Sequence, residues 1–153
     1  MIKINVFSEE KAWSKKIKKK ELFFNKICKA FPKKYKFFNK KISLTLLLSN
    51  NRNIRKLNKR FRNKDKSTDV LSFPLNKKVV KNKDVYIGDI IISYNYLAKQ
   101  QRHQLKTFKE RAVKIFIHGF LHLLGFDHIK NYDYKKMLKE EENIYQSVIS
   151  KID

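Results

Sequence analysis

The sequence predicts an α+β fold, in which helices pack on a mixed sheet of roughly four strands. Segments with apolar residues at every second position are mixed with segments whose apolar residues recur every three or four positions. Apolar and aromatic residues make up 42% of the 153 residues, which is enough for one sizeable core. The chain contains no internal repeat and no linker-like segment, so we predict a single domain over residues 1–153.

The first part of the chain is predicted to contain two strands and two helices. Residues 2–7 alternate apolar and polar side chains, which is typical of a strand, and residues 9–31 are expected to form one amphipathic helix. A second strand is expected over residues 41–48. Either Ser49 or Asn50 can cap the helix that follows, because both side chains can accept a hydrogen bond from a free backbone N–H group.

The middle of the chain is predicted to add two more strands. Residues 70–73 read as a short buried strand, and the polar, Lys-rich residues 76–84 read as a loop. Residues 84–93 are mostly β-branched and apolar, which favours a central strand. Gly88 interrupts that run and predicts a bulge or a close approach of another backbone segment.

The last third of the chain is predicted to be helical. A short helix is expected over residues 94–103, and Thr107 with Glu110 matches a capping box that would open a helix over residues 108–124. Asp133 is expected to cap the last helix. Because the second half of the 108–124 helix is almost entirely apolar, we expect it to lie at the centre of the fold.

Charge and composition narrow the possible partners and compartments. The chain carries 37 Lys and Arg against 14 Asp and Glu, a net charge of +23, which favours polyanions: nucleic acid or an anionic membrane surface. Most of these cations are Lys, a bias that an A+T-rich genome can also produce. The single Cys28 cannot form an internal disulfide, and no signal peptide or apolar run of about 18 residues is present. We therefore expect a cytoplasmic protein without a membrane span.

Three of the four histidines lie within eleven residues. His118 and His122 are four residues apart on the predicted helix, so both imidazoles can reach one ion. Gly125 can end the helix in the left-handed conformation, and the bend beyond it can return His128 to the same ion. Three neutral nitrogen ligands suit zinc and leave a fourth position for water, so the cluster predicts a zinc hydrolase.

The same spacing occurs in metzincin proteases, but one difference disfavours that chemistry. Such proteases carry a general-base Glu directly after the first ligand, where this chain has Gly119. A glycine inside a helix costs roughly 1 kcal/mol relative to Ala, so a close contact is expected there. The identity of the general base stays open. The acidic alternatives are Asp69, Asp89, Asp127 and Glu140–Glu142. Each is more typical of a structural role: Asp127 as a support for a ligating histidine, and Glu140–Glu142 as a mostly solvated helix face.

Three sequence blocks resemble one known family. The segment HGFLHLLGFDH over 118–128 is similar to the signature of the YbeY family of bacterial single-strand-specific endoribonucleases, also called rRNA maturation factors. The block LNKRFRNKDKSTDVLSFP over 57–74 and the element IGDI over 87–90 resemble two further family motifs. Phe61 stands where the family usually has Tyr, and Ser67 where it usually has Pro; neither is an expected ligand.

The resemblance implies one zinc ion per chain on His118, His122 and His128, and a functional arginine at Arg62. It places His118 and Arg62 in the reaction. The expected substrate is single-stranded ribosomal RNA of the small subunit, with roles in 16S rRNA 3′-end maturation and ribosome quality control. Two alternatives remain: a non-catalytic ribosome-assembly or RNA-binding factor braced by zinc, and, with less support, a metzincin-like protease.

Overall fold

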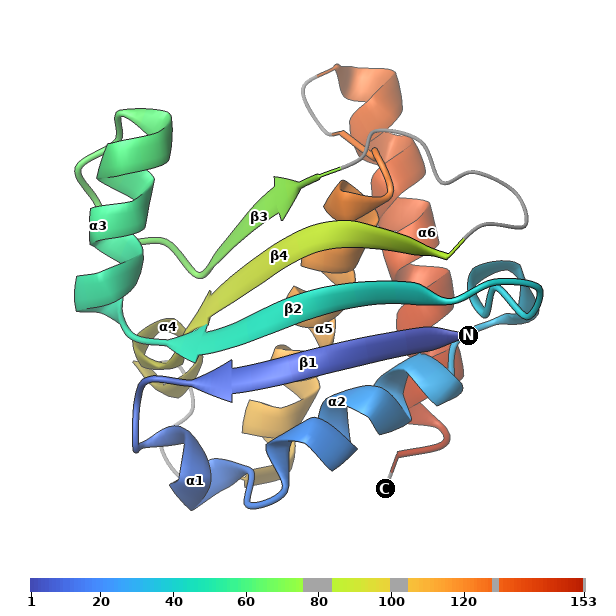
Figure 1. Ribbon diagram of the computed structural model, residues 1–153, viewed down its shortest axis with the longest axis horizontal. Coiled ribbons are helices and arrows are strands. Elements are labelled where there is room, and N and C mark those ends of the chain that lie inside the picture. Colours follow the sequence, from blue (N-terminus) through green and yellow to red (C-terminus); the bar gives the residue numbers. More distant parts are fainter. Residues whose placement is uncertain (76–83, 100–104, 128–129, 153) are drawn as a thin grey trace.

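A single mixed sheet organises the fold. The computed structural model describes residues 1–75, 84–99, 105–127 and 130–152. The described strands are β1 (Ile2–Ser8), β2 (Ile42–Ser49), β3 (Val70–Pro74) and β4 (Val85–Ser93). They are ordered β1-β2-β4-β3, with β1, β2 and β4 parallel and β3 antiparallel at one edge (Figure 1). The predicted four-stranded mixed sheet is therefore confirmed.

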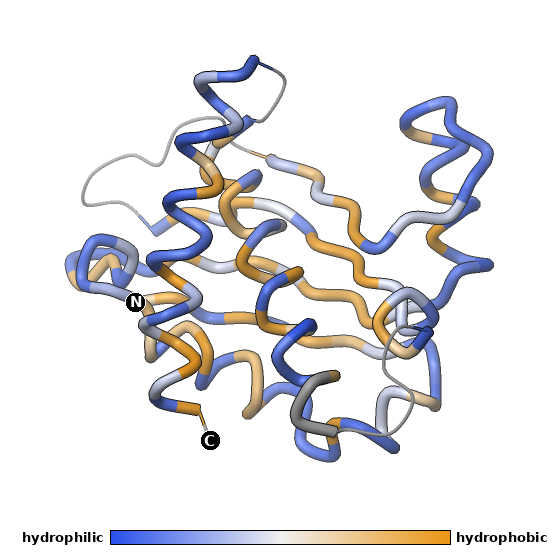
Figure 2. Tube along the Cα trace, turned by 180° about the vertical axis from the view of Figure 1, so that it is seen from behind, coloured by the Kyte–Doolittle hydropathy of each residue, from blue (hydrophilic) through white to orange (hydrophobic). Residues whose placement is uncertain are grey.

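Most helices cover one face of this sheet. The described helices are α1 (Trp13–Lys16), α2 (Lys20–Lys29), a short 3₁₀ turn (Lys33–Tyr35), α3 (Asn51–Arg62), α4 (Tyr94–Lys99), α5 (Leu105–Leu123) and α6 (Asn131–Ile149). Seen from behind, α5 and α6 lie across the sheet with apolar strand residues beneath them (Figure 2). Alternate residues of β2 point into this core, and Ile42, Leu44, Leu46 and Leu48 are each fully buried. Helix α3 packs on the opposite side through a smaller cluster around Ile54, Leu71 and Ile91.

The predicted helix over residues 9–31 is wrong in one respect, because it is two helices. Helix α1 ends at Lys16, the backbone of the next residue, Ile17, is extended, and α2 begins at Lys20. In a continuous helix, Lys15 would lie beside Lys19, and Lys16 beside Lys20, and like charges at this spacing are destabilising. The break removes both contacts while Ile17 stays buried at 2% exposure.

Gly88 has both features that its position predicted. The β2–β4 register shifts between Ser43 and Leu44, which makes an irregularity next to Gly88, and Gly88 has φ +134°. A Cβ atom at this position would lie 2.2 Å from the carbonyl oxygen of Phe73 on the neighbouring edge strand. The glycine therefore allows β3 to pair closely with β4, which brings β3 against α5.

The predicted starts of the last two long helices are corrected by three residues each. Helix α5 begins at Leu105, so Thr107 lies inside it and cannot be its cap. Helix α6 begins at Asn131 with Lys130 as the flanking residue, so Asp133 lies in the first turn, where a negative charge still favours the helix N-terminus.

Other boundaries agree with the sequence. The side chain of Asn50 caps α3 by accepting a hydrogen bond from the Asn53 N–H group at 2.9 Å. The predicted short helix after β4 is confirmed as α4 up to Lys99. The predicted loop over 76–84 and the end of the predicted 94–103 helix fall almost wholly outside the described residues. None of the described helices has the length and apolar character needed to cross a membrane.

Candidate active site

A cleft of about 520 Å³ lies between the C-terminal half of α5 and the edge strand β3. Three of the four predicted site residues, Arg62, His118 and His122, line it together, although Arg62 comes from a different helix. His128, the fourth, lies outside the described residues. The remaining lining residues are Thr68, Asp69, Val70, Leu71, Ser72, Pro74, Gly125, Phe126 and Asp127.

The two histidines of α5 point their Nε2 atoms at each other. These atoms are 3.1 Å apart, and the ring centroids are separated by 4.6 Å. One turn of helix separates the two residues, which is why their side chains lie on the same face. Two ligands that each lie about 2.0–2.1 Å from one zinc ion can adopt this nitrogen–nitrogen separation.

The backbone that follows α5 fixes the second histidine. Gly125 has φ +99°, its N–H group donates to the His122 carbonyl oxygen at 3.0 Å, and the Phe126 N–H group donates to the Leu121 carbonyl oxygen at 3.0 Å. This pair of hydrogen bonds forms a Schellman motif, and the left-handed helix end predicted at Gly125 is confirmed. It also brings the Phe126 carbonyl oxygen within 2.9 Å of His122 Nδ1.

A carboxylate from α6 fixes the first histidine. His118 Nδ1 lies 2.5 Å from Oε1 of Glu141, and both side chains are less than one-third exposed. This contact corrects the expectation that Glu140–Glu142 form a solvated helix face. The second ring nitrogen of a metal-binding histidine commonly donates a hydrogen bond to a carboxylate or a backbone carbonyl, which orients the ring. No local pattern pairs Glu141 with His118, because the two residues are 23 positions apart.

These partners determine which ring nitrogens carry protons. A carbonyl oxygen can only accept, so His122 Nδ1 carries the hydrogen in its contact with Phe126. An ionised Glu141 is likewise an acceptor, which places a hydrogen on His118 Nδ1. In the neutral rings both Nε2 atoms are then acceptors, and they face each other at 3.1 Å. Such an arrangement is favourable when a cation binds both nitrogens.

Glu140, the neighbour of Glu141, has a different role. It accepts a hydrogen bond from the Tyr35 hydroxyl and pairs with Lys34 at 3.1 Å. The hydrogen bond from Tyr35, followed by that from Lys34, holds the pKa of Glu140 below its usual value. Glu140 therefore fastens the 3₁₀ turn to α6, and adjacent glutamates serve the fold and the cleft separately.

Arg62 reaches the cleft because α3 ends beside it. Asn63 adopts the left-handed conformation at φ 56°, and the Lys64 N–H group donates to the Asn58 carbonyl oxygen at 3.3 Å. The buried Asn58 side chain donates to the Lys66 carbonyl oxygen at 2.8 Å and so holds the loop after the helix. The exposed Arg62 side chain, one residue before this helix end, lines the cleft.

Gly119 has the close contact that its position in a helix predicted. A Cβ atom there would lie 3.0 Å from Ile90 Cγ2 and 3.1 Å from Ser72 Oγ, and Ser72 Oγ donates to the Gly119 carbonyl oxygen at 3.2 Å. The position after the first histidine therefore faces the sheet. A larger side chain there would require Ile90 and Ser72 to shift, and Gly119 itself offers no acid that could act as the metzincin general base.

The acidic alternatives for a general base separate in space. Asp69 and Asp127 line the cleft, whereas Asp89 lies in a different groove with Phe7 and Phe61. Among the described residues no cluster of three or more His, Cys, Asp or Glu side chains is arranged to hold a metal. The described site therefore supplies two converging nitrogen ligands, His118 Nε2 and His122 Nε2, that fit a zinc ion. His128 stays a predicted third ligand.

Comparisons with known proteins agree on one family. Residues 5–149 match the model of the family described as Endoribonuclease YbeY. The chain is 61% identical over 152 residues to Endoribonuclease YbeY of Pelagibacter ubique (strain HTCC1062), with 99% of both chains covered. It is 37% identical over 110 residues to Endoribonuclease YbeY of Aquifex aeolicus (strain VF5), with 72% of each covered.

A solved structure shares the fold. The chain superimposes on the solution structure of TM1509 from Thermotoga maritima with a TM-score of 0.61 and 27% sequence identity, covering 98% of this chain and 90% of the other. Together with the family match over almost the whole length, these findings confirm the family that the three sequence blocks predicted. The chain belongs to the Endoribonuclease YbeY family.

Proposed function

We propose that the chain is a zinc-dependent endoribonuclease that cleaves single-stranded ribosomal RNA. Its expected roles are maturation of the 16S rRNA 3′ end and ribosome quality control. The observation that carries the zinc proposal is the convergence of His118 Nε2 and His122 Nε2 at 3.1 Å, with each Nδ1 held by an acceptor. His128 is the proposed third ligand, and one ion binds per chain.

The residues of the cleft suit attack on a phosphodiester. Bound zinc supplies a Lewis acid and lowers the pKa of a coordinated water to about 7. Arg62 holds two non-bridging oxygens of the scissile phosphate, because a guanidinium matches that geometry. Glu141 and the Phe126 carbonyl keep both imidazoles in the orientation for binding. The excess of 37 basic over 14 acidic residues attracts the RNA backbone.

The two alternatives are less well supported. A metzincin-like protease needs an acid after its first ligand, whereas this chain has Gly119, which packs tightly against Ile90 and Ser72. A non-catalytic factor braced by zinc needs no arginine in the metal cleft, yet Arg62 lines it. An assembly role remains compatible with cleavage, so activity on RNA is the deciding measurement.

The decisive experiment compares cleavage of one RNA in single-stranded form and annealed to its complement. We expect the wild-type protein to cleave only the single strand. Arg62→Ala should lower kcat by about 10²–10³, the usual cost of removing one group that stabilises transition-state charge. His118→Ala should abolish cleavage, because it removes a proposed ligand.

Arg60→Ala is the matched control. Arg60 has the same charge and lies on the same helix, but its guanidinium is 5.3 Å from the Phe61 ring centroid and it does not line the cleft. We expect its activity to stay within about twofold of wild type, as for an exposed cation that makes no contact with the reacting phosphate. If Arg62→Ala and His118→Ala cleave as well as Arg60→Ala, the RNA activity belongs to a contaminant and the proposal fails.

A further inference from the structure

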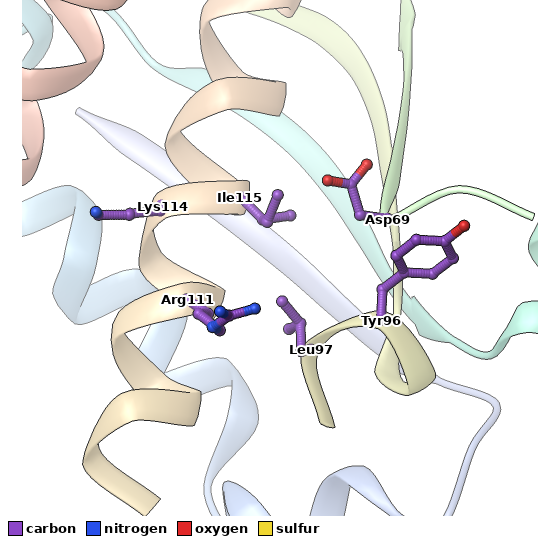
Figure 3. Close-up of a pocket in the computed structure, with 6 residues that line it drawn as sticks. All are labelled: Asp69, Tyr96, Leu97, Arg111, Lys114 and Ile115. Carbon is purple, nitrogen blue, oxygen red and sulfur yellow. The ribbon is translucent and has the colours of Figure 1, made fainter. Parts of the chain in front are cut away.

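A second pocket adjoins the histidine cleft. It has a volume of about 290 Å³ and lies between α4, α5 and the start of β3 (Figure 3). The residues that line it are Asp69, Tyr96, Leu97, Arg111, Lys114 and Ile115. Asp69 also lines the histidine cleft, so the two spaces meet at this residue.

One face of α5 connects the two spaces. Arg111, Ile115, His118 and His122 follow one another at steps of four, three and four residues, which places them along one side of a helix. Arg111 therefore lies roughly 10 Å from His118 along the helix axis. When the scissile phosphate of a bound RNA lies at His118 and His122, the adjoining nucleotide lies in front of the second pocket.

The pocket combines apolar walls with two opposite charges. Arg111 and Ile115 extend from α5 towards Leu97 and Asp69, as Figure 3 shows. The amino group of Lys114 points to the other side of the helix, where it lies 4.7 Å from the Tyr145 ring centroid, so its charge is directed away from the pocket.

Tyr96 forms a further wall of the pocket. Its hydroxyl donates to the Ser67 carbonyl oxygen at 3.2 Å, and the residue is 37% exposed. An aromatic ring held in this way offers a surface on which a base can stack, and such stacking is a common way of binding unpaired nucleotides.

Asp69 is held so that one carboxylate oxygen is available to a ligand. Oδ1 accepts hydrogen bonds from the Val70 N–H group at 2.8 Å and from the Thr68 hydroxyl at 3.2 Å. Oδ2 accepts none from the described residues. A carboxylate beside apolar walls recognises a base that presents an amino group, such as N4 of cytosine. Uracil presents a carbonyl oxygen in the same place, and two acceptors repel each other.

We propose that this pocket binds the base of a nucleotide next to the scissile phosphate, and that it selects a base with an exocyclic amino group over uracil. Tyr96, Leu97 and Ile115 contact the faces of the base, Asp69 Oδ2 accepts from its amino group, and Arg111 pairs with the adjoining phosphate. The inference rests on the proposed ribonuclease function and assigns part of its substrate preference.

The test uses a short oligouridylate that carries a single cytidine, because cytosine and uracil differ at the group that Asp69 contacts. Wild type should cleave mainly at one position, at a fixed distance from the cytidine. The cleavage rate there should be about fivefold or more above the rate at the other positions. In Asp69→Asn the pattern should become even, because an amide can donate to the uracil oxygen. Even cleavage by wild type, or an unchanged pattern in Asp69→Asn, would overturn the inference.

A second pair of variants tests the phosphate contact. Arg111→Ala should raise KM by about tenfold with little change in kcat, since it removes a charge-assisted hydrogen bond to bound substrate. Lys109→Ala is the matched control, because it also removes a cation from α5. The Lys109 amino group lies 5.8 Å from the Phe23 ring centroid, away from the pocket. Equal KM values for the two variants would refute the phosphate contact. If no RNA is cleaved at all, the proposed function fails together with this inference.

Discussion

Two faces of α5 differ in residue type and in burial. One face carries Phe108, Ala112, Phe116 and Phe120, all fully buried in the main core. The other face carries four residues that line the two pockets and are partly exposed: Arg111, Ile115, His118 and His122. The buried face anchors the helix, so the polar face can present titratable groups in fixed positions. Substitutions on the first face should therefore change stability, and those on the second should change binding.

Phe116→Ala should have the largest effect. Phe116 is fully buried and packs against Phe24 and Phe120, with ring centroids 5.5 and 6.3 Å away. Truncation should lower the free energy of unfolding by about 3–5 kcal/mol, as for other buried Phe to Ala changes. Urea denaturation measures this loss. Because Phe116 lies on the buried face, we predict unchanged zinc content per folded chain. A folded Phe116→Ala variant without zinc would show that the two faces are not independent.

Glu141→Gln should have the next largest effect, and it should fall on metal binding. Loss of the carboxylate that holds His118 Nδ1 should weaken zinc binding by about 10–100-fold, which competition with a chelator measures. Glu142→Gln is the control, since Glu142 binds Gln146 at 2.7 Å on the same helix. Equal zinc affinities for the two variants would contradict the assigned role of Glu141.

Gly119→Ala should have the smallest effect. Glycine to alanine in a helix usually gains about 1 kcal/mol. The new methyl group would lie 3.0 Å from Ile90 Cγ2, and overpacking typically costs about 1–3 kcal/mol. We expect a net loss of about 1 kcal/mol in thermal or urea unfolding. A gain in stability would show that Ile90 and Ser72 shift at little cost to make room for the methyl group.

Local patterns in the sequence predicted most of the fold. Alternating apolar residues identified the strands, Asn50 capped α3, and Gly125 ended α5 as its position indicated. The caps assigned to Thr107 and Asp133 were wrong because each helix begins two residues before the residue assigned as its cap. The break near Ile17 was missed, because the apolar spacing fits one continuous helix while the Lys pairs oppose it.

The candidate site was predictable only where its residues are close in sequence. One helical turn explains the His118–His122 pair. Glu141 was not predictable, because its contact depends on how α6 packs against α5, and no local pattern encodes that packing. Arg62 followed only from the family resemblance; its place in the cleft depends on the left-handed Asn63 that ends α3.

Metal analysis of the purified protein tests the central claim most directly, because the paired imidazoles are proposed to bind one zinc ion. We predict one equivalent of zinc in the wild-type chain, and loss of that zinc in both His118→Ala and His128→Ala while each variant remains folded by circular dichroism. Wild-type protein that contains no stoichiometric divalent metal and cleaves RNA equally well after dialysis against a chelator would contradict the claim.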